Sequence, residues 1–358
     1  MTMIASQQKI SGDNYKFKSI KAMVDTGITH IPSDFILPLY MQPRFTRSDN
    51  SRDVPTIDLS LVNDPFERKR IATSIVEAAK GWGIFKVHGH GIAERLRKKV
   101  LQVMREFFDL PLTDKVQFLG SQGEASGPRY GRTRRGTTGH QSWRDQFHHR
   151  IPPLTPSELE TWPEKPESYR DTVLEWTKEI HKLSNVLFDL LTEAYNLEPR
   201  YFQDLMGVAE STGELDATML SAYYPRCPQA DQASGIVAHT DPTGMVVAIQ
   251  DSPGLEVLKD GTWIPVAPDP ACITISTGDA MEILTNGSCK SCEHRVRVKE
   301  TQDRVSALVI LKPSLDIKLE AAPAFITKGD PTRFIGTNMT YREYLRMFKD
   351  KRPEVTFD

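Results

Sequence analysis

The sequence predicts a mainly β protein with flanking helices, an α+β chain built around a β-sandwich or jelly roll. From Ala217 to Leu311, short stretches with strand propensity are separated by Gly, Pro, Asp and Asn, which is typical of these folds. The region before Ala217 shows helical periodicity instead. A chain of 358 residues can bury a sizeable core, and all-β folds with added helices often remain one domain at this length.

The N-terminal half is expected to hold an arm, two strands and three helices. Residues 1 to about 50 predict a partly ordered arm, and residues 54–59 predict a short strand. Proline at the first helical position or apolar residues at helical spacing predict helices over residues 65–80, 93–110 and 164–195. Residues 81–87 predict a strand entered through glycines. Residues 127–150 carry six arginines and three histidines, and we expect a solvated loop there rather than a nucleic-acid patch.

The C-terminal half is expected to supply the sheets. Turn residues delimit strands over residues 219–224, 245–250, 255–258, 263–266, 273–277, 282–284, 294–298 and 305–311. A closing helix is expected over residues 340–349.

Composition narrows the classes of function. A net charge of −2 and a pI near 6.5 give no reason to expect nucleic acid or a membrane surface as a partner. Residues 1–18 contain no apolar core of a signal peptide, and no stretch approaches transmembrane length. The four cysteines are too few and too irregularly spaced for a disulfide framework. We therefore expect a soluble cytoplasmic protein with reduced thiols.

Three motifs invite other readings that the residues do not support. Cys289 and Cys292 lie near a histidine, but a closed zinc site needs four ligands and no second cysteine pair is present. The pair Gly81 and Gly83 lacks the third glycine of a dinucleotide fingerprint. His90, in His88-Gly89-His90-Gly91, is expected to have a structural role in its turn.

A metal site is predicted from the stretch Gly235-Ile236-Val237-Ala238-His239-Thr240-Asp241-Pro242. Side chains two residues apart in an extended chain point the same way, so His239 and Asp241 can bind one ion. A second histidine, His294, follows later in the chain. Two imidazoles and one carboxylate on one face of an octahedron, with open positions, are typical of non-haem Fe(II) oxygenases.

An anion site is predicted beyond the metal ligands. Arg304 and Ser306 share a face at the start of the apolar run 305–311. An arginine fork beside a hydroxyl is suited to a carboxylate.

With these motifs in order, residues 54 to about 353 resemble the plant-type 2-oxoglutarate- and Fe(II)-dependent dioxygenases. The resemblance implies a double-stranded β-helix, which is a distorted jelly roll. It also implies an arm (residues 1–53), a helical and mixed region (54–205), the β-helix with the metal site (206–325), and a C-terminal helix and tail (326–358), all in one structural unit.

The resemblance further implies that His239, Asp241 and His294 bind Fe(II) as the catalytic centre. The cosubstrates would be 2-oxoglutarate and O2, with ascorbate as reductant, and the products succinate, carbon dioxide and an oxidised substrate. Tyr224, Arg304 and Ser306 match the residues that bind 2-oxoglutarate in the family. The family's asparagine in Asn-Tyr-Tyr-Pro is replaced by Ala222, which puts one cosubstrate contact in doubt.

Five further positions bear on the choice of substrate. The resemblance implies that these five positions contact the substrate, as they do in related enzymes: Gln146, His148, Leu220, Ile310 and Lys312. His148 and Lys312 suit an acidic or phenolic group. The expected substrate is a small plant metabolite such as a flavonoid, coumarin, alkaloid or acidic hormone, which a monomer would hydroxylate, desaturate or demethylate.

Two alternatives remain open at this point. A relative that keeps the iron ligands can use ascorbate without 2-oxoglutarate. A catalytically idle homologue can bind a metabolite without turnover.

Overall fold

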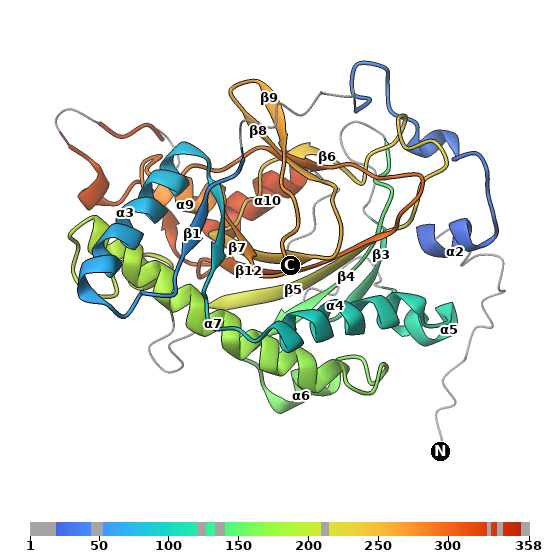
Figure 1. The fold of residues 1–358 in the computed structure, drawn as a ribbon, viewed down its shortest axis with the longest axis horizontal. Helices are drawn as coiled ribbons and strands as arrows, with labels where there is room; N and C mark the ends of the chain where they lie inside the picture. The colour runs from blue at the N-terminus through green and yellow to red at the C-terminus, as the bar shows by residue number, and fades with distance from the viewer. Residues whose placement is uncertain are drawn as a thin grey trace.

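The computed structural model describes residues 19–43, 53–119, 127–132, 140–208, 215–327, 331–334 and 339–351. Two β-sheets form its centre, and helices cover the outer face of the larger sheet (Figure 1). This arrangement confirms the predicted fold, a mainly β chain with flanking helices and a jelly-roll core.

The larger sheet has eight strands in the order β1-β2-β10-β7-β12-β5-β4-β3, and the smaller has four in the order β6-β11-β8-β9. Only the β1–β2 pair is parallel among these strands. The strands of the larger sheet are β1 (Thr56–Asp58), β2 (Ile84–His88), β3 (Arg129–Arg132), β4 (Asp145–Ile151), β5 (Asp216–Tyr224), β7 (Met245–Gln250), β10 (Ile273–Thr277) and β12 (Arg304–Lys312). Those of the smaller sheet are β6 (Ile236–His239), β8 (Leu255–Lys259), β9 (Thr262–Pro265) and β11 (His294–Val296), and a separate pair is formed by β13 (Lys318–Leu319) and β14 (Met339–Thr340).

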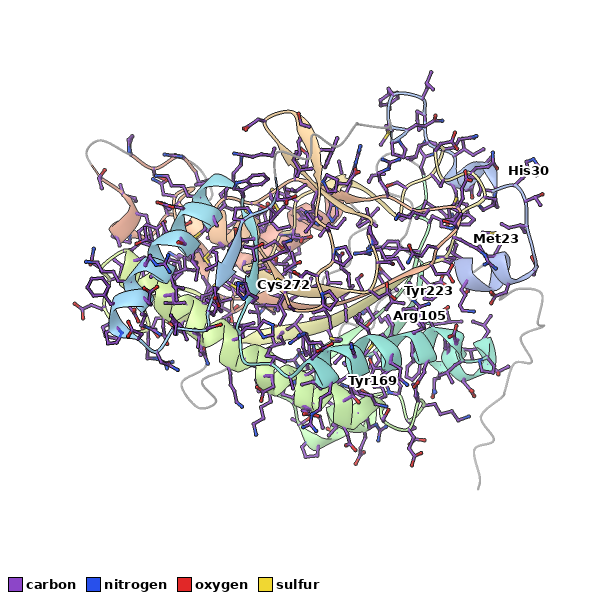
Figure 2. The ribbon with its side chains drawn as sticks, in the orientation of Figure 1. Met23, His30, Arg105, Tyr169, Tyr223 and Cys272 are labelled. Carbon is purple, nitrogen blue, oxygen red and sulfur yellow. The ribbon has the colours of Figure 1, made fainter. Side chains whose placement is uncertain are left out.

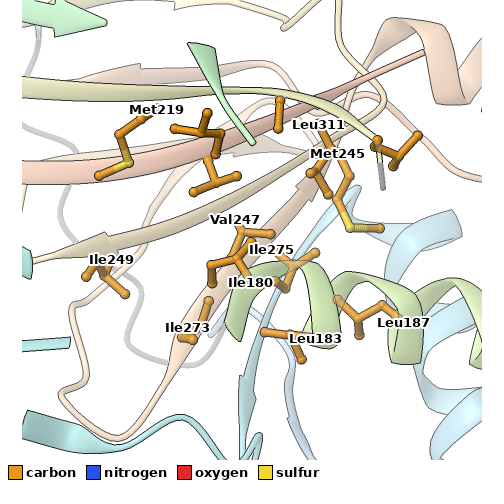
Figure 3. Close-up of a cluster of buried hydrophobic side chains, with 14 of the residues drawn as sticks. Ile180, Leu183, Leu187, Met219, Met245, Val247, Ile249, Ile273, Ile275 and Leu311 are labelled. Carbon is orange, nitrogen blue, oxygen red and sulfur yellow. The ribbon is translucent and has the colours of Figure 1, made fainter. Parts of the chain in front are cut away.

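The helices include three long ones that pack together beside the larger sheet, α3 (Pro65–Gly81), α4 (Glu94–Asp109) and α7 (Tyr169–Ala194). Figure 3 shows Ile180, Leu183 and Leu187 of α7 against side chains of the sheet such as Val247 and Ile275. The shorter helices are α2 (Ile20–Asp25), α5 (Leu112–Lys115), α6 (Pro156–Glu160), α8 (Tyr201–Leu205), α9 (Asp279–Leu284) and α10 (Tyr341–Lys351), and single 3-10 turns are η1 (Ser33–Phe35), η2 (Val116–Phe118) and η3 (Pro323–Phe325).

Strand β12 shows how the sheet divides core from cavity. Its odd-numbered residues, Val305 to Leu311, are buried in the hydrophobic core under the helices. Its even-numbered residues from Arg304 to Ile310 line a cavity on the opposite face. Because strand side chains alternate, one strand serves both purposes.

The N-terminal segment is anchored from residue 19 onward. The buried carboxylate of Asp145 accepts hydrogen bonds from Ser19 Oγ (2.7 Å), Ile20 N (2.7 Å) and Lys21 N (3.1 Å). Ile20 packs in a second hydrophobic cluster with Tyr224 and Ile236. Residues 20–36 therefore pack against residues that line the cavity, such as Tyr224 and Ile236. Residues 1–18 and 44–52 of the predicted arm lie outside the described part of the chain.

Two predicted elements are wrong. Residues 282–284 belong to helix α9, not to a strand. The arginine-rich stretch is not simply a solvated loop, since it contains β3 and β4, and His148 and His149 are buried. The inner face of β4 carries polar side chains toward a cavity. Because of them the sequence of this stretch is polar and resembles that of a solvated loop. Within the described ranges, no helix has the length and apolar character needed to cross a membrane.

Candidate active site

The predicted metal ligands come together in a cavity lined by residues of both sheets. Strands β6 and β11 pair so that His239 lies opposite His294, and Asp241 follows two residues after the first histidine. Potential ligand atoms of the three side chains lie within 4.8 Å of one another. Both Nε2 atoms face the Asp241 carboxylate, at 3.5 Å from His239 and 3.7 Å from His294.

Backbone carbonyls fix the tautomer of both histidines. His239 Nδ1 donates to Val237 O (2.9 Å), and His294 Nδ1 donates to Cys292 O (3.2 Å). A carbonyl oxygen only accepts, so each Nδ1 carries the proton and each Nε2 lone pair faces Asp241. The two rings are thus oriented to bind one ion through Nε2.

The protonation states also suit a divalent cation. Burial lowers the pKa of His294 to about 4, so this imidazole is neutral at physiological pH. Burial alone would raise the pKa of Asp241, whereas His294 and His239, when protonated, and Arg144 lower it; with the imidazoles neutral, Arg144 is the cation that still favours the ionised carboxylate. Neutral imidazoles and an ionised carboxylate are the forms that bind metal. This donor set fits Fe(II) with positions left open.

The buried arginine Arg304 lies further along the same cavity. Its Nη2 donates to Gln250 Oε1 (2.5 Å) and its Nε donates to Ser252 O (3.2 Å). Its Nη1 lies 3.4 Å from Ser306 Oγ, and its guanidinium lies 4.8 Å from the centre of the Tyr224 ring. These contacts hold a cation, a hydroxyl and a phenol at one end of the cavity. Carboxylates are recognised by such groups.

Tyr224 is distinguished from its neighbour by the alternation of β5. Tyr223 points away from the cavity toward Arg105 of α4 (Figure 2), and its hydroxyl donates to Asp303 Oδ2 (2.8 Å). Burial raises the pKa of the Tyr224 hydroxyl, but Arg144 and Arg304 outweigh this effect and lower the pKa from its usual value. The Tyr224 hydroxyl therefore lies in a strongly positive part of the cavity.

Arg144 is a site residue that the sequence analysis missed. It is buried, lines the cavity, and places Nη1 3.4 Å from the Tyr224 hydroxyl. It lies just before β4, next to Trp143, whose indole donates to Pro225 O (3.1 Å). Residues 143–147 resemble a family segment that borders the substrate, but an arginine beside a large apolar residue in a polar stretch does not by itself distinguish a buried arginine from a solvated one.

The predicted substrate residues divide into two groups. Gln146, Leu220 and Ile310 line the same cavity as the metal ligands. His148 lies directly across from Leu220 in the β4–β5 ladder, and Lys312 follows Ile310 on the same face of β12. They extend the wall of the cavity without being part of its lining.

His148 and Lys312 are both strongly buried, at 6% and 4% exposure. Neither ring nitrogen of His148 has a hydrogen-bond partner among the described residues. Burial, with the nearby charge of Arg129 next in effect, lowers the pKa of His148 to about 3. Burial also lowers the pKa of Lys312, and Asp216 opposes that shift. A buried imidazole without partners is costly unless something else binds it.

The remaining position of interest is Ala222, which is fully buried and lies across from Gln146 in the β4–β5 ladder. An amide side chain thus lies beside the alanine, on the neighbouring strand.

The other motifs have structural roles. His90 Nδ1 accepts a hydrogen bond from Ile92 N (3.1 Å), in agreement with a role in its turn. All four cysteines are free and buried. Burial raises the pKa of both Cys289 and Cys292 to about 12, so these thiols remain protonated.

Comparison with known families gives matches over both halves of the chain. A family model described as the 2OG-Fe(II) oxygenase superfamily matches residues 215–313. A second, described as the N-terminal region of non-haem dioxygenases in morphine synthesis, matches residues 54–172.

Individual relatives align over nearly the full length. A flavonol synthase/flavanone 3-hydroxylase of Eustoma exaltatum subsp. russellianum is 32% identical over 94% of this chain and 97% of its own. Jasmonate-induced oxygenase 4 of Arabidopsis thaliana is 28% identical, covering 94% of each chain. Among solved structures, JOX2 in complex with 2OG, Fe and JA superposes with a TM-score of 0.79 at 29% identity, over 92% of both chains.

Proposed function

The chain belongs to the 2OG-Fe(II) oxygenase superfamily, and from this premise we propose which of its residues carry the reaction and what class of substrate it takes. It is an oxidoreductase that uses Fe(II) and 2-oxoglutarate to oxidise a small molecule. The relatives and the solved structure favour this activity over an ascorbate-dependent oxidase or an idle binding homologue.

We assign His239, Asp241 and His294 as the Fe(II) ligands. The observation that carries this assignment is the convergence of two Nε2 lone pairs and one ionised carboxylate, with both Nδ1 atoms held by backbone carbonyls. Fe(II) supplies, with 2-oxoglutarate and O2, the oxidising power to attack an unactivated C–H bond.

The protein's own contribution is binding, orientation and exclusion of water. Arg304, Ser306 and Tyr224 would hold the distal carboxylate of 2-oxoglutarate through charge-assisted hydrogen bonds. Arg144 adds positive charge close to Asp241 and His294. The apolar side chains of Val246, Leu308 and Ile310 line the rest of the cavity and keep water from the reacting atoms.

We propose an acidic or phenolic plant metabolite as the primary substrate, in the size class of a flavonoid, coumarin, alkaloid or acidic hormone. His148 supports this proposal, because its two ring nitrogens can donate one hydrogen bond and accept another. Lys312 supports it as a buried cation on the same wall. One relative is named for a flavanone, and JOX2 was solved with JA in its complex, so both names are consistent with a small metabolite as substrate.

We further propose hydroxylation as the default outcome, ascorbate as the reductant, and action as a cytoplasmic monomer. The near-neutral net charge of −2 gives no electrostatic reason for a nucleic-acid or membrane partner.

The test is anaerobic titration of the protein with Fe(II) and then 2-oxoglutarate, followed by visible absorption of the iron-bound keto acid. We expect a weak charge-transfer band that is lost in His239→Ala. A metabolite panel scored by succinate release then identifies the substrate. If iron binds but the band is absent, the assignment of 2-oxoglutarate to this cavity is wrong.

A further inference from the structure

The residues at the start of helix α9 donate backbone hydrogen bonds to the turn that carries Asp241. Three successive backbone amides of this segment donate to the turn: Gly278 N to Gly244 O (3.0 Å), Asp279 N to Asp241 O (2.7 Å) and Ala280 N to Thr243 O (3.1 Å). The approach is so close that a Cβ on Gly278 would lie 2.4 Å from Thr243 O. The backbone of the metal-binding turn is therefore packed directly on α9.

The side chain of Asp279 extends this support. Its Oδ2 accepts a hydrogen bond from Thr240 Oγ1 (3.3 Å), and Thr240 lies between the ligands His239 and Asp241. The same oxygen accepts a hydrogen bond from the Tyr344 hydroxyl (3.0 Å). Tyr344 belongs to α10, close to the C-terminal end of the chain.

Helix α9 also contacts the segment that leads to the third ligand. Glu282 Oε2 accepts a hydrogen bond from Ser291 N (3.1 Å), three residues before His294. One short helix thus contacts both segments that carry metal ligands.

Helix α10 is itself fixed in place. Tyr341 N donates to Ile317 O (2.8 Å) and Arg342 N donates to Leu315 O (2.9 Å). The Tyr344 hydroxyl can therefore act as a fixed donor to Asp279, rather than as a mobile surface group.

From these contacts we propose that Asp279 is a positioning residue for the metal-binding turn, and that Tyr344 couples the C-terminal helix to the affinity for metal. The proposal rests on the assignment of His239, Asp241 and His294 as metal ligands. Without Asp279, the turn populates conformations in which Asp241 and the histidines do not converge. Apparent affinity then falls by the fraction of molecules that remain competent to bind.

The test measures metal binding without turnover. Mn(II) is titrated into wild-type protein and variants, and free Mn(II) is followed by its electron paramagnetic resonance signal. We expect Asp279→Ala to raise the dissociation constant by at least about tenfold, the range seen when groups that orient metal ligands are removed. Tyr344→Phe and Thr240→Val each remove one donor to Asp279 and should raise it by about threefold or more.

Two variants separate positioning from other causes. Asp279→Asn keeps an acceptor oxygen and should stay within about threefold of wild type, because the hydrogen bonds are retained. Tyr223→Phe removes a comparable tyrosine-to-aspartate hydrogen bond on the opposite face of the sheet and should leave Mn(II) affinity unchanged. Equal losses in Asp279→Asn and Asp279→Ala would show that charge, not positioning, matters, and would overturn the proposal.

His294→Ala in the same titration distinguishes the two levels of inference. If wild type binds Mn(II) and His294→Ala does not, the ligand assignment holds, and unchanged affinity in Tyr344→Phe and Thr240→Val overturns only the role of Asp279. If wild type and His294→Ala bind alike, the ligand assignment itself is wrong. Should Asp279→Ala fail to fold, Tyr344→Phe and Thr240→Val still decide the matter.

Discussion

The metal end of the cavity and the wall carrying His148 and Lys312 differ in how their polar atoms are satisfied before a ligand binds. At the metal end, both histidines have a carbonyl partner on Nδ1 and face a carboxylate with Nε2. On the wall, neither nitrogen of His148 has a partner within the described part of the chain. One region is preorganised by the protein, and the other leaves polar groups for a ligand to satisfy.

This difference indicates how tolerant each region should be to change. Removing a group from a preorganised constellation leaves its partners misplaced, so the loss is large and general. Removing an unsatisfied group from the wall relieves a desolvation cost and affects only ligands that would have used it. Four changes test the contrast, from the largest expected effect to the smallest.

At the metal end, His294→Ala should lower affinity for Fe(II) by more than about 100-fold, because a ligand counts for more than the groups that orient it. Succinate formation should be lost with it. Metal titration and product analysis measure both quantities. His30→Ala, which changes an exposed histidine, is the control and should match wild type. Retention of tight iron binding in His294→Ala would contradict the ligand assignment.

Further along the same cavity, Arg304→Met should raise the 2-oxoglutarate concentration for half-saturation about 10- to 100-fold, as expected for loss of hydrogen bonds to a charged group. Binding of Fe(II) alone should change little. The measurement is calorimetric titration of the metal-loaded, oxygen-free protein. Arg68→Met removes a surface arginine that pairs with Glu193 and should behave as wild type. An unchanged affinity for 2-oxoglutarate in Arg304→Met would place its carboxylate elsewhere.

On the wall, Lys312→Met should weaken binding of an acidic substrate by about tenfold and leave 2-oxoglutarate binding intact. A neutral analogue of the same substrate should bind as before. Steady-state kinetics with the two substrates separate these effects. Lys318→Met, at an exposed lysine, is the matched control. Equal losses for acidic and neutral substrates would mean that Lys312 contributes packing rather than charge.

The smallest effect concerns stability and pH. Burial lowers the pKa of His148 to about 3, against about 6.5 for an ordinary imidazole, so between these values the unfolded chain binds a proton that the folded chain excludes. The contribution of His148 to the free energy of unfolding is therefore fully present above about pH 6.5 and decreases as the pH falls below that value. When the pH is lowered from about 7 to 5, the free energy of unfolding of His148→Leu should therefore decrease by about 1 to 2 kcal/mol less than that of wild type. Urea unfolding at the two pH values measures this, and identical losses would show that His148 takes up its proton in the folded state.

The sequence is sufficient to predict site residues where these residues are neighbours on one strand. His239 with Asp241, and Arg304 with Ser306, share a face by simple alternation. Most strands are placed to within a few residues because turn residues separate them, and residues 245–250 and 273–277 match β7 and β10. The four-region division of the chain stays a prediction.

The sequence is insufficient to predict a residue's role where the surroundings of that residue are formed by segments distant in the chain. Arg144 looks like any arginine in a polar stretch, and only the pairing of β4 with β5 places it beside Tyr224. The same pairing buries His148, although its sequence neighbourhood predicts a solvated stretch. Ile283 and Leu284 favour a strand over residues 282–284, but Gly278 and Asp279 before them begin a helix that packs on the turn carrying Asp241.

Strand β12 has a consequence for how this enzyme can change its substrate over evolutionary time. Its inward-facing positions run from Arg304 and Ser306 at one end to Ile310 and Lys312 at the other, in steps of roughly 7 Å. If Ile310 and Lys312 contact the substrate as proposed, substitutions there can change substrate choice while Arg304 and Ser306, the proposed binders of 2-oxoglutarate, stay fixed. Insertion of a single residue would instead exchange the inward and outward sets and put core side chains into the cavity. Variation in residue type is therefore expected at Ile310 and Lys312, whereas the length of the strand is constrained.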